Sequence, residues 1–393
     1  MMKLAKWAGL IGLGALALAG CSSTDEDLRK PAELVDFSGE VKADVLWSTS
    51  VGDGIGPYFS NLAPVMAYDK LYAASREGVV KALDRNSGKT LWQVDLGDAD
   101  GLFEARDNMR LSGGVSAGFG KIYIGSENGV VYALDAESGE LAWQATVPGE
   151  AMAAPVPESG LVLVNTTSGK LVALDADNGQ QRWMHEQNLP SLTLRGASEP
   201  TTVSGAAVFG TPAGKLAAVF VENGRLIWEQ AVSPAKGENV LELLRDVDAT
   251  PVVVGPIAYA VAYNGELVAI ELRSGRVLWK RDYSSYRSMV VVGYDLLLVD
   301  DRGYLYALDR RNGLEKWSQP MLENRRVTAP TVVGSKVVVG DFEGYLHWFD
   351  LGTGELLGRK KIDSSGLYAR PLLMDDKVVV QSRDGDVALV SLD

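Results

Sequence analysis

One recurring pattern constrains the fold of this chain more than any other feature. Its clearest copy runs from Gly129 to Trp143 and reads GVVYALDAESGELAW. Related copies open at six further glycines, and a half-copy opens at Gly385. The six are Gly78, Gly169, Gly214, Gly265, Gly303 and Gly344. Self-similarity at a period of about 40–45 residues is typical of repeat architectures, in which each repeat is one supersecondary unit.

Each copy predicts a β-hairpin. In residues 129–135, alternate side chains point to opposite faces, as in a half-buried strand. A Ser-Gly, Asn-Gly or Thr-Gly pair follows, which suits a tight turn with positive φ. The acidic residue four positions before the turn glycine can accept backbone N–H groups there. The period leaves room for two more strands per unit, and this predicts a four-stranded propeller blade.

A small residue and a tryptophan occupy matched places in the copies, and we expect both to be structural. The small residue is Ala82, Ala133, Ala173, Ala218, Ala269 or Ala307. The tryptophan is Trp92, Trp143, Trp183, Trp228, Trp279 or Trp317. We expect a large ring from a neighbouring blade to pack over each alanine. A residue that recurs in every unit indicates architecture more strongly than a ligand platform.

The ends of the chain complete the repeat count. The half-copy after Gly385 lacks its return strand, whereas Trp47 stands one period before Trp92 without a partner hairpin. We therefore predict an all-β fold, an eight-bladed β-propeller of four-stranded antiparallel blades. Pairing of the N- and C-terminal strands closes the ring and leaves no open edge. The propeller is expected to occupy residues 44–393.

The N-terminal residues have the pattern of a bacterial lipoprotein signal. Lys3 and Lys6 precede a short apolar run, and Leu18-Ala19-Gly20-Cys21 has the form of a lipobox. We expect residues 1–20 to be a signal peptide, Cys21 to be lipidated, and residues 21–43 to form a tether. Cys21 is the single cysteine, so it has no disulfide partner within the chain. An ordinary signal peptide with an incidental cysteine is the alternative.

The composition argues against several functional classes. The net charge of −13 argues against nucleic-acid binding and against docking on anionic lipid through a basic patch. The two histidines, His185 and His347, lie in different repeats, and the chain has no Cys/His cluster with metal-ligand spacing. The sequence thus predicts no catalytic residues, no metal site and no cofactor.

The repeat A-[LI]-[DE]-x-x-[STN]-G-x-x-x-W resembles the tryptophan-docking motif of pyrroloquinoline-quinone (PQQ) dehydrogenases. Those enzymes are eight-bladed propellers, and many use a vicinal disulfide and a calcium ion beside a catalytic Asp. A single cysteine cannot form that disulfide within the chain, so this resemblance covers the scaffold rather than the site. A PQQ-dependent, dehydrogenase-like periplasmic enzyme is therefore kept as the alternative function.

Nearly the whole chain resembles the BamB family of outer-membrane protein assembly factors. The resemblance rests on the lipobox, the eight repeats and several stretches outside the repeats. These stretches are residues 110–114 (RLSGG), 191–196 (SLTLRG), 244–251 (LRDVDATP), 262–265 (AYNG), 340–348 (GDFEGYLHW) and 363–366 (DSSG). It implies a lipid-anchored scaffold at the outer membrane, facing the periplasm. The implied partners are the POTRA domains of BamA and other members of the β-barrel assembly (BAM) complex. The propeller architecture adds the hypothesis that an outer blade edge captures unfolded outer-membrane proteins by strand addition.

Two connections between blades are longer than those from Trp143 to Pro155 and from Trp317 to Pro330, and they are expected to bind the partner. They run from Trp183 to Pro200 and from Trp228 to Pro251. Long, ordered loops are common functional sites. The family resemblance assigns BamA binding to five of their residues: Leu192, Leu194, Arg195, Asp246 and Asp248. In the simpler alternative, Arg195 pairs with Asp246 or Asp248 only to brace the two loops.

Overall fold

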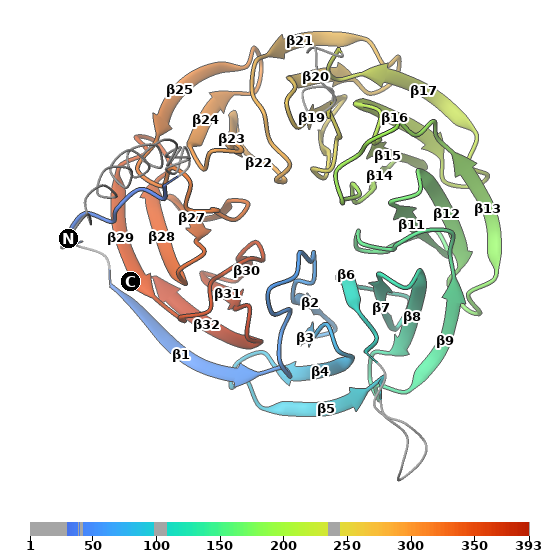
Figure 1. The fold of residues 1–393 in the computed structure, drawn as a ribbon, viewed down its shortest axis with the longest axis horizontal. Coiled ribbons are helices and arrows are strands. Elements are labelled where there is room, and N and C mark those ends of the chain that lie inside the picture. The colour runs from blue at the N-terminus through green and yellow to red at the C-terminus, as the bar shows by residue number, and fades with distance from the viewer. Residues whose placement is uncertain (1–29, 38, 40–41, 98–107, 235–243, 393) are drawn as a thin grey trace, which may run out of the picture.

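The eight blades form a closed ring around a central axis, and the four strands of each blade lie side by side in order from the centre to the rim (Figure 1). The computed structural model describes residues 30–37, 39, 42–97, 108–234 and 244–392. Every described regular element is a β-strand, and every blade is a four-stranded antiparallel sheet. The prediction of an all-β, eight-bladed propeller is confirmed. The expected signal peptide and Cys21 lie outside the described residues.

The strands follow the chain, four to a blade, from the inner to the outer edge. Blade 1 contains β2 (Val65–Ala67), β3 (Lys70–Ala74), β4 (Val79–Asp84) and β5 (Thr90–Asp95), and blade 2 contains β6 (Leu111–Gly118), β7 (Lys121–Ser126), β8 (Val130–Asp135) and β9 (Leu141–Thr146). Blade 3 contains β10 (Val156–Glu158), β11 (Leu161–Thr166), β12 (Lys170–Asp175) and β13 (Gln181–Glu186). Blade 4 contains β14 (Thr201–Val203), β15 (Ala206–Gly210), β16 (Lys215–Phe220) and β17 (Leu226–Ala231). Blades 5 to 7 consist of β18 (Val252–Val254), β19 (Ile257–Val261), β20 (Leu267–Glu271), β21 (Val277–Arg281); β22 (Val290–Val292), β23 (Asp295–Val299), β24 (Leu305–Asp309), β25 (Leu314–Gln319); and β26 (Thr331–Val333), β27 (Lys336–Gly340), β28 (Tyr345–Asp350), β29 (Leu356–Lys361).

Blade 8 is built from both ends of the chain. It contains β30 (Leu372–Met374), β31 (Lys377–Gln381), β32 (Asp386–Leu392) and, as its outer strand, β1 (Ala43–Ser50). The β1–β32 pairing is antiparallel and extends from Ala43 opposite Leu392 to Ser50 opposite Asp386. The predicted closure by the termini is confirmed, and it pairs the β32 edge that would otherwise stay open.

The turn between the third and fourth strands follows the predicted chemistry. In blade 2, Asp135 Oδ1 accepts backbone N–H groups from Glu137 at 2.9 Å and from Ser138 at 2.8 Å. Gly139 closes the turn at a φ of 79°, a conformation that glycine adopts without strain. Because this chemistry is local, the pattern alone predicts where each hairpin turns.

Each motif tryptophan docks on the turn glycine of the next blade. A Cβ atom added to Gly139 would lie 2.7 Å from the Trp92 ring. The remaining tryptophan–glycine pairs are Trp47–Gly88, Trp143–Gly179, Trp183–Gly224, Trp228–Gly275, Trp279–Gly313 and Trp317–Gly354. Five of the indole nitrogens also donate a hydrogen bond of 2.7–3.2 Å to a backbone carbonyl of that turn. The docking contact therefore joins consecutive blades at the rim of the ring.

The expectation that a neighbouring blade's ring packs over each motif alanine is wrong. Ala82 lies opposite Tyr72 on one side and Trp92 on the other, and both belong to its own blade. The two ring centroids are 5.9 Å apart. The small residue of blade 1 thus lies between two rings of its own sheet, while the tryptophan reaches the next blade through the turn.

In blade 7, the small residue and the tryptophan of the repeat exchange places. Trp348 occupies the alanine position, and Gly358 lies opposite it at the tryptophan position. A ring at position 358 has no turn to dock on, because β32 and β1 come from opposite ends of the chain. The N-terminal segment occupies this place instead: a Cβ atom added to Gly39 would lie 3.1 Å from Gly358 Cα.

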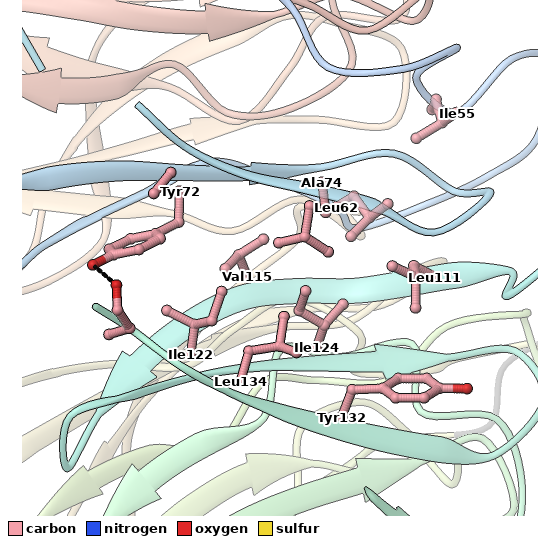
Figure 2. Close-up of a cluster of buried hydrophobic side chains, with 13 residues drawn as sticks. Ile55, Leu62, Tyr72, Ala74, Leu111, Val115, Ile122, Ile124, Tyr132 and Leu134 are labelled. Atoms are coloured by element: carbon pink, nitrogen blue, oxygen red, sulfur yellow. Dashed lines mark hydrogen bonds between the residues drawn. The ribbon is translucent and has the colours of Figure 1, made fainter. Parts of the chain in front are cut away.

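The hydrophobic cores lie between neighbouring blades. The cluster between blades 1 and 2 buries Tyr72, Ile122, Leu134 and other apolar side chains from both sheets (Figure 2). Tyr72 donates its hydroxyl hydrogen to Ala136 O at 3.0 Å, so the buried phenol is satisfied across the interface. Because each core needs two blades, stability depends on the contacts between neighbours.

The described part of the N-terminal segment lies against blades 6 and 7. Ala32 N donates to Glu323 O at 2.8 Å, and the buried Arg325 donates to Ala32 O at 2.9 Å. Arg359 of β29 donates to Val35 O at 2.8 Å. These bonds hold residues 32–35 on the ring before the chain enters β1.

Candidate partner-docking surface

All connections between blades emerge on one face of the ring, which we call the docking face. The strands of a blade alternate in direction, so the turn between its second and third strands lies on the same face as the connection to the next blade. The tryptophan-docking turns lie on the opposite face. The two long connections predicted from the sequence therefore share the docking face.

The described parts of these connections are residues 187–200, between β13 and β14, and residues 244–251, before β18. We call these two segments the docking loops. Pro200 and Pro251 directly precede the inner strands β14 and β18, as the sequence pattern indicates. Since proline donates no backbone hydrogen bond, it suits the entry to a strand rather than its interior.

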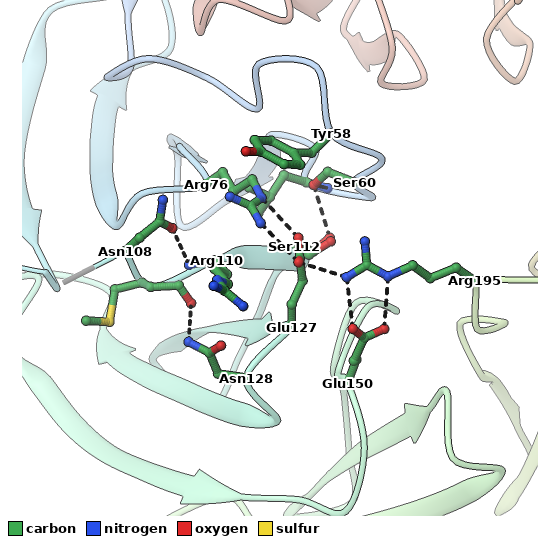
Figure 3. A network of polar contacts seen from close by, with 12 residues as sticks. Tyr58, Ser60, Arg76, Asn108, Arg110, Ser112, Glu127, Asn128, Glu150 and Arg195 are labelled. Atoms are coloured by element: carbon green, nitrogen blue, oxygen red, sulfur yellow. Dashed lines mark hydrogen bonds and ion pairs between the residues drawn. The ribbon is translucent and has the colours of Figure 1, made fainter.

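Arg195 reaches back from the first docking loop to two glutamates of blades 2 and 3 (Figure 3). Its Nη2 atom lies 2.8 Å from Glu127 Oε2 and 2.8 Å from Glu150 Oε1. Nε donates to the second oxygen of Glu150 at 3.2 Å. Hydrogen bonds with Glu150 and Glu127 raise the pKa of Arg195, so the guanidinium stays charged. Its side chain is still 47% exposed and available for contact.

Glu127 connects Arg195 to a second arginine. Arg76 of blade 1 binds Glu127 through two parallel hydrogen bonds of 3.0 Å. The Tyr58 ring covers Arg76 with its centroid 3.8 Å from Cζ. Burial opposes ionisation of Glu127, but its bonds with Arg76 and Arg195 outweigh burial and hold its pKa below the ordinary value. We call Arg76, Glu127, Arg195 and Glu150 the charge ladder.

The alternative in which Arg195 pairs with Asp246 or Asp248 is wrong, because Arg195 pairs with Glu127 and Glu150 instead. Asp246 is buried, and its Oδ1 accepts the backbone N–H of Leu194 at 2.9 Å. Asp248 packs against the backbone at Gly196, where an added Cβ atom would lie 2.3 Å from Oδ2. The side chains of Asp246 and Asp248 in the second loop therefore support the backbone of the first loop, and the Arg195 side chain binds the glutamates of the charge ladder instead.

Burial is the largest cause of the raised pKa values of Asp246 and Asp248. It raises the pKa of Asp246 to about 6, against the opposing effect of the Leu194 N–H bond. Burial, with the nearby charge of Asp246, raises the pKa of Asp248 to about 7. Both groups therefore titrate close to neutral pH, unlike exposed aspartates.

The two predicted leucines contribute unequally to the surface. Leu192 is 42% exposed, whereas Leu194 is half-buried between the loops. Exposed Leu189 extends the apolar area along the same loop. An exposed leucine on the same loop as a fixed guanidinium resembles the apolar centre and polar rim of a protein interface.

The sequence interpretation missed Arg76, Glu127, Glu150 and Tyr58. One signal was present: Arg76 and Glu127 both stand two residues before the opening glycine of their repeats. That offset is the tip of the turn between the second and third strands, so its residues line the docking face. The identity of the residue at this offset varies between copies while the scaffold around it repeats, which marks the position as a place for function.

The described ranges contain no group of three or more His, Cys, Asp or Glu side chains arranged to hold a metal ion. They also contain no helix with the length and apolarity that crossing a bilayer requires. His347, one of the two histidines, is fully buried and lies 2.9 Å from Asp341 in blade 7. That place, within the strand β28, is structural.

The family model and the relatives matched by sequence have the same description. Residues 76–319 match the family model described as outer membrane protein assembly factor BamB. The chain is 43% identical over 383 residues to the protein of that name from Shewanella oneidensis, covering 97% of both chains. It is 47% identical to the one from Vibrio cholerae, covering 98% of this chain and 97% of that one.

Among solved structures, the crystal structure of BamB from Moraxella catarrhalis superposes with a TM-score of 0.79. It covers 89% of this chain and 100% of its own, at 24% sequence identity, and so supports the fold alone. The family model and the near-full-length relatives decide the classification. The chain belongs to the BamB family of outer membrane protein assembly factors.

Proposed function

We propose that this protein is a non-catalytic assembly factor of the outer membrane that binds the POTRA domains of BamA within the BAM complex. The docking loops form its binding surface, with Leu192, Leu194 and Arg195 toward the partner and Asp246 and Asp248 beneath them. Cys21 carries the lipid that holds the ring at the outer membrane, facing the periplasm. The names of the relatives, at nearly full coverage, support the assembly role.

The observation that most directly supports this proposal is the fixed orientation and the exposure of the Arg195 side chain. Its guanidinium is oriented by Glu127 and Glu150 before any partner arrives, and it remains about half exposed on the same loop as the exposed Leu192. Because the side chain is already held in place, less side-chain conformational entropy is lost on binding. A fixed cation on the same loop as an exposed leucine is therefore suited to an interface with an acidic rim on the partner.

The test is calorimetric titration of a purified POTRA fragment against wild type and variants. We expect Arg195→Gln and Leu192→Asp to weaken binding by about 30-fold or more each, as for interface residues worth about 2 kcal/mol. Arg225→Gln is the matched control, because Arg225 is an exposed arginine on a turn of the opposite face. Unchanged affinity in Arg195→Gln and Leu192→Asp places the site elsewhere on the ring.

Glu150→Gln separates direct contact from bracing of the loop. This variant keeps Arg195 but removes one of the two carboxylates that orient it. If Arg195 touches the partner, Glu150→Gln should retain most of the affinity that Arg195→Gln loses. Equal losses in both variants, with altered melting curves, assign Arg195 to bracing.

The alternative, a PQQ-dependent dehydrogenase, is tested directly. Adding PQQ and calcium to the purified protein should produce neither the quinone absorbance of a bound cofactor nor dye-linked alcohol oxidation. Turnover in that assay would replace the scaffold proposal with the enzyme.

A further inference from the structure

A cavity of about 1150 Å³ lies on the ring axis at its docking-face end. Its walls are the turns and blade connections of that face, and they include Tyr58, Phe342, Tyr368 and Arg383. Small-molecule sites commonly occupy about 300–1,000 Å³. The cavity is therefore large enough for a small organic molecule or for the end of a peptide.

Two arginines, Arg326 and Arg383, lie on the part of the cavity wall that blades 7 and 8 form. Arg383, in the turn between β31 and β32, donates from Nη2 to Tyr58 O at 2.9 Å. Within the described ranges, neither Arg383 nor Arg326 forms an ion pair. Burial lowers the pKa of Arg383, and the like charge of nearby Arg326 lowers it further, against the opposing effects of Tyr368 and Asp384. Both residues thus line the cavity, and their guanidinium groups are close enough to repel each other.

Tyr368 adds a third donor at the same place. Its hydroxyl is buried and finds no hydrogen-bond partner among the described residues. Burial raises the pKa of Tyr368 against the opposing charge of Arg383, so the hydroxyl keeps its proton. A buried hydroxyl without a partner costs about 1–3 kcal/mol. An acceptor supplied by a ligand would remove that cost.

The remaining charges of the cavity are accounted for differently. Arg370 donates to Thr331 Oγ1 at 3.0 Å and interacts with the charge of Glu199. Burial raises the pKa of both Glu199 and Asp248 to about 7, so these carboxyls are partly protonated near neutral pH. Arg287 and Asp301 also line the cavity; Arg287 donates to the Tyr286 hydroxyl at 2.9 Å, and burial raises the pKa of Asp301. Positive charge therefore remains at Arg326 and Arg383, although the whole chain has a net charge of −13.

We propose that Arg326, Arg383 and Tyr368 form a binding site for the carboxylate of a ligand whose apolar or aromatic body packs against the cavity wall. Arginine and tyrosine supply only donors here, which matches a carboxylate and its several acceptor positions. Phe342 and Leu367, which line the same cavity, offer the apolar contact. A free small acid and the terminal carboxylate of a peptide share this chemistry.

The experiment compares acids with their amides, because each pair differs only in the anionic group. N-acetylphenylalanine and N-acetylphenylalaninamide represent the small molecule. A short unstructured peptide that ends in phenylalanine, as free acid and as amide, represents the chain terminus. Ligand-observed saturation-transfer NMR with the whole protein measures the affinities, which we expect in the millimolar range or tighter. At least one acid should bind about tenfold more tightly than its amide.

Variants then locate the binding. Arg383→Gln should abolish the difference between acid and amide, and Tyr368→Phe, which keeps the ring volume, should reduce it about threefold or more. Arg225→Gln on the opposite face should leave it unchanged. Equal binding of acid and amide, binding of none of the four ligands, or a difference that survives both cavity variants would overturn the proposal. The titration with the POTRA fragment is independent of these results.

Discussion

The docking of each tryptophan on the next turn predicts an unequal response to one substitution at two glycines. Gly139 and Gly160 have nearly the same backbone, with φ of 79° and 77°. A Cβ atom at Gly139 would lie 2.7–3.0 Å from the Trp92 ring, whereas at Gly160 it would meet nothing within 4 Å. Alanine should therefore suffer the same backbone strain at both sites and a steric clash at only one.

The magnitudes follow from these contacts. Left-handed backbone costs an alanine about 1–2 kcal/mol, which is the full expected loss for Gly160→Ala. Overpacking against a buried ring adds about 1–3 kcal/mol, so Gly139→Ala should lose about 2–5 kcal/mol. For a ring of about 350 residues, the unfolding entropy is about 0.7 kcal/mol per kelvin, so about 3 kcal/mol lowers the melting temperature by about 4 °C.

Urea unfolding followed by tryptophan fluorescence and circular dichroism measures both variants. A double-mutant cycle isolates the contact: in a Trp92→Leu background, Gly139→Ala should cost no more than Gly160→Ala. If Gly139→Ala and Gly160→Ala destabilise equally in wild type, or if the Gly139→Ala loss is the same with and without Trp92, the docking argument fails.

Three further perturbations test other parts of the structure. Deleting residues 44–48 removes most of β1 and exposes the β32 edge, so the melting temperature should fall sharply; an unchanged value contradicts closure by β1. Cys21→Ala should abolish palmitate labelling and release a folded protein that still binds the POTRA fragment, and label persisting in the variant rules out Cys21 as the lipidation site. Because burial raises the pKa of Asp248 to about 7, its ionisation destabilises the folded state progressively as pH rises from about 4 to about 7. Asp248→Asn should therefore gain stability over wild type above pH 7 but not near pH 4, measured by urea unfolding, and identical pH profiles of the two proteins would refute the assigned pKa.

The sequence alone determined the blades and their number. Turn position, strand alternation and the tryptophan at the end of each hairpin are local properties, and repetition shows them several times over. The unpaired Trp47 and the half-copy after Gly385 even predict the closure, because an eight-unit ring has one place for both. Local chemistry sufficed here since each strand pairs with its sequence neighbour, apart from β1.

The exchange of Trp348 and Gly358 is visible in the sequence, but its reason is tertiary. The next blade has no turn at that place, and the N-terminal segment lies there instead. The pairing of Arg195 was likewise decided by the ring. Sequence reasoning offered the aspartates of the neighbouring long loop as the alternative to partner binding, whereas the fold brings Glu127, 68 residues away along the chain, to the guanidinium.

Throughout the site, the sequence predicts the structure within each blade, whereas contacts between blades depend on the tertiary structure. A repeat pattern defines each blade internally, but the tilt between blades and the path of each connection decide which turn tips meet. Arg76, Glu127 and Arg383 share one offset in their repeats, so the sequence could have placed all three on the docking face. It could not show that the first two are joined by an ion pair while the third faces an open cavity, because that depends on what the neighbouring blades present.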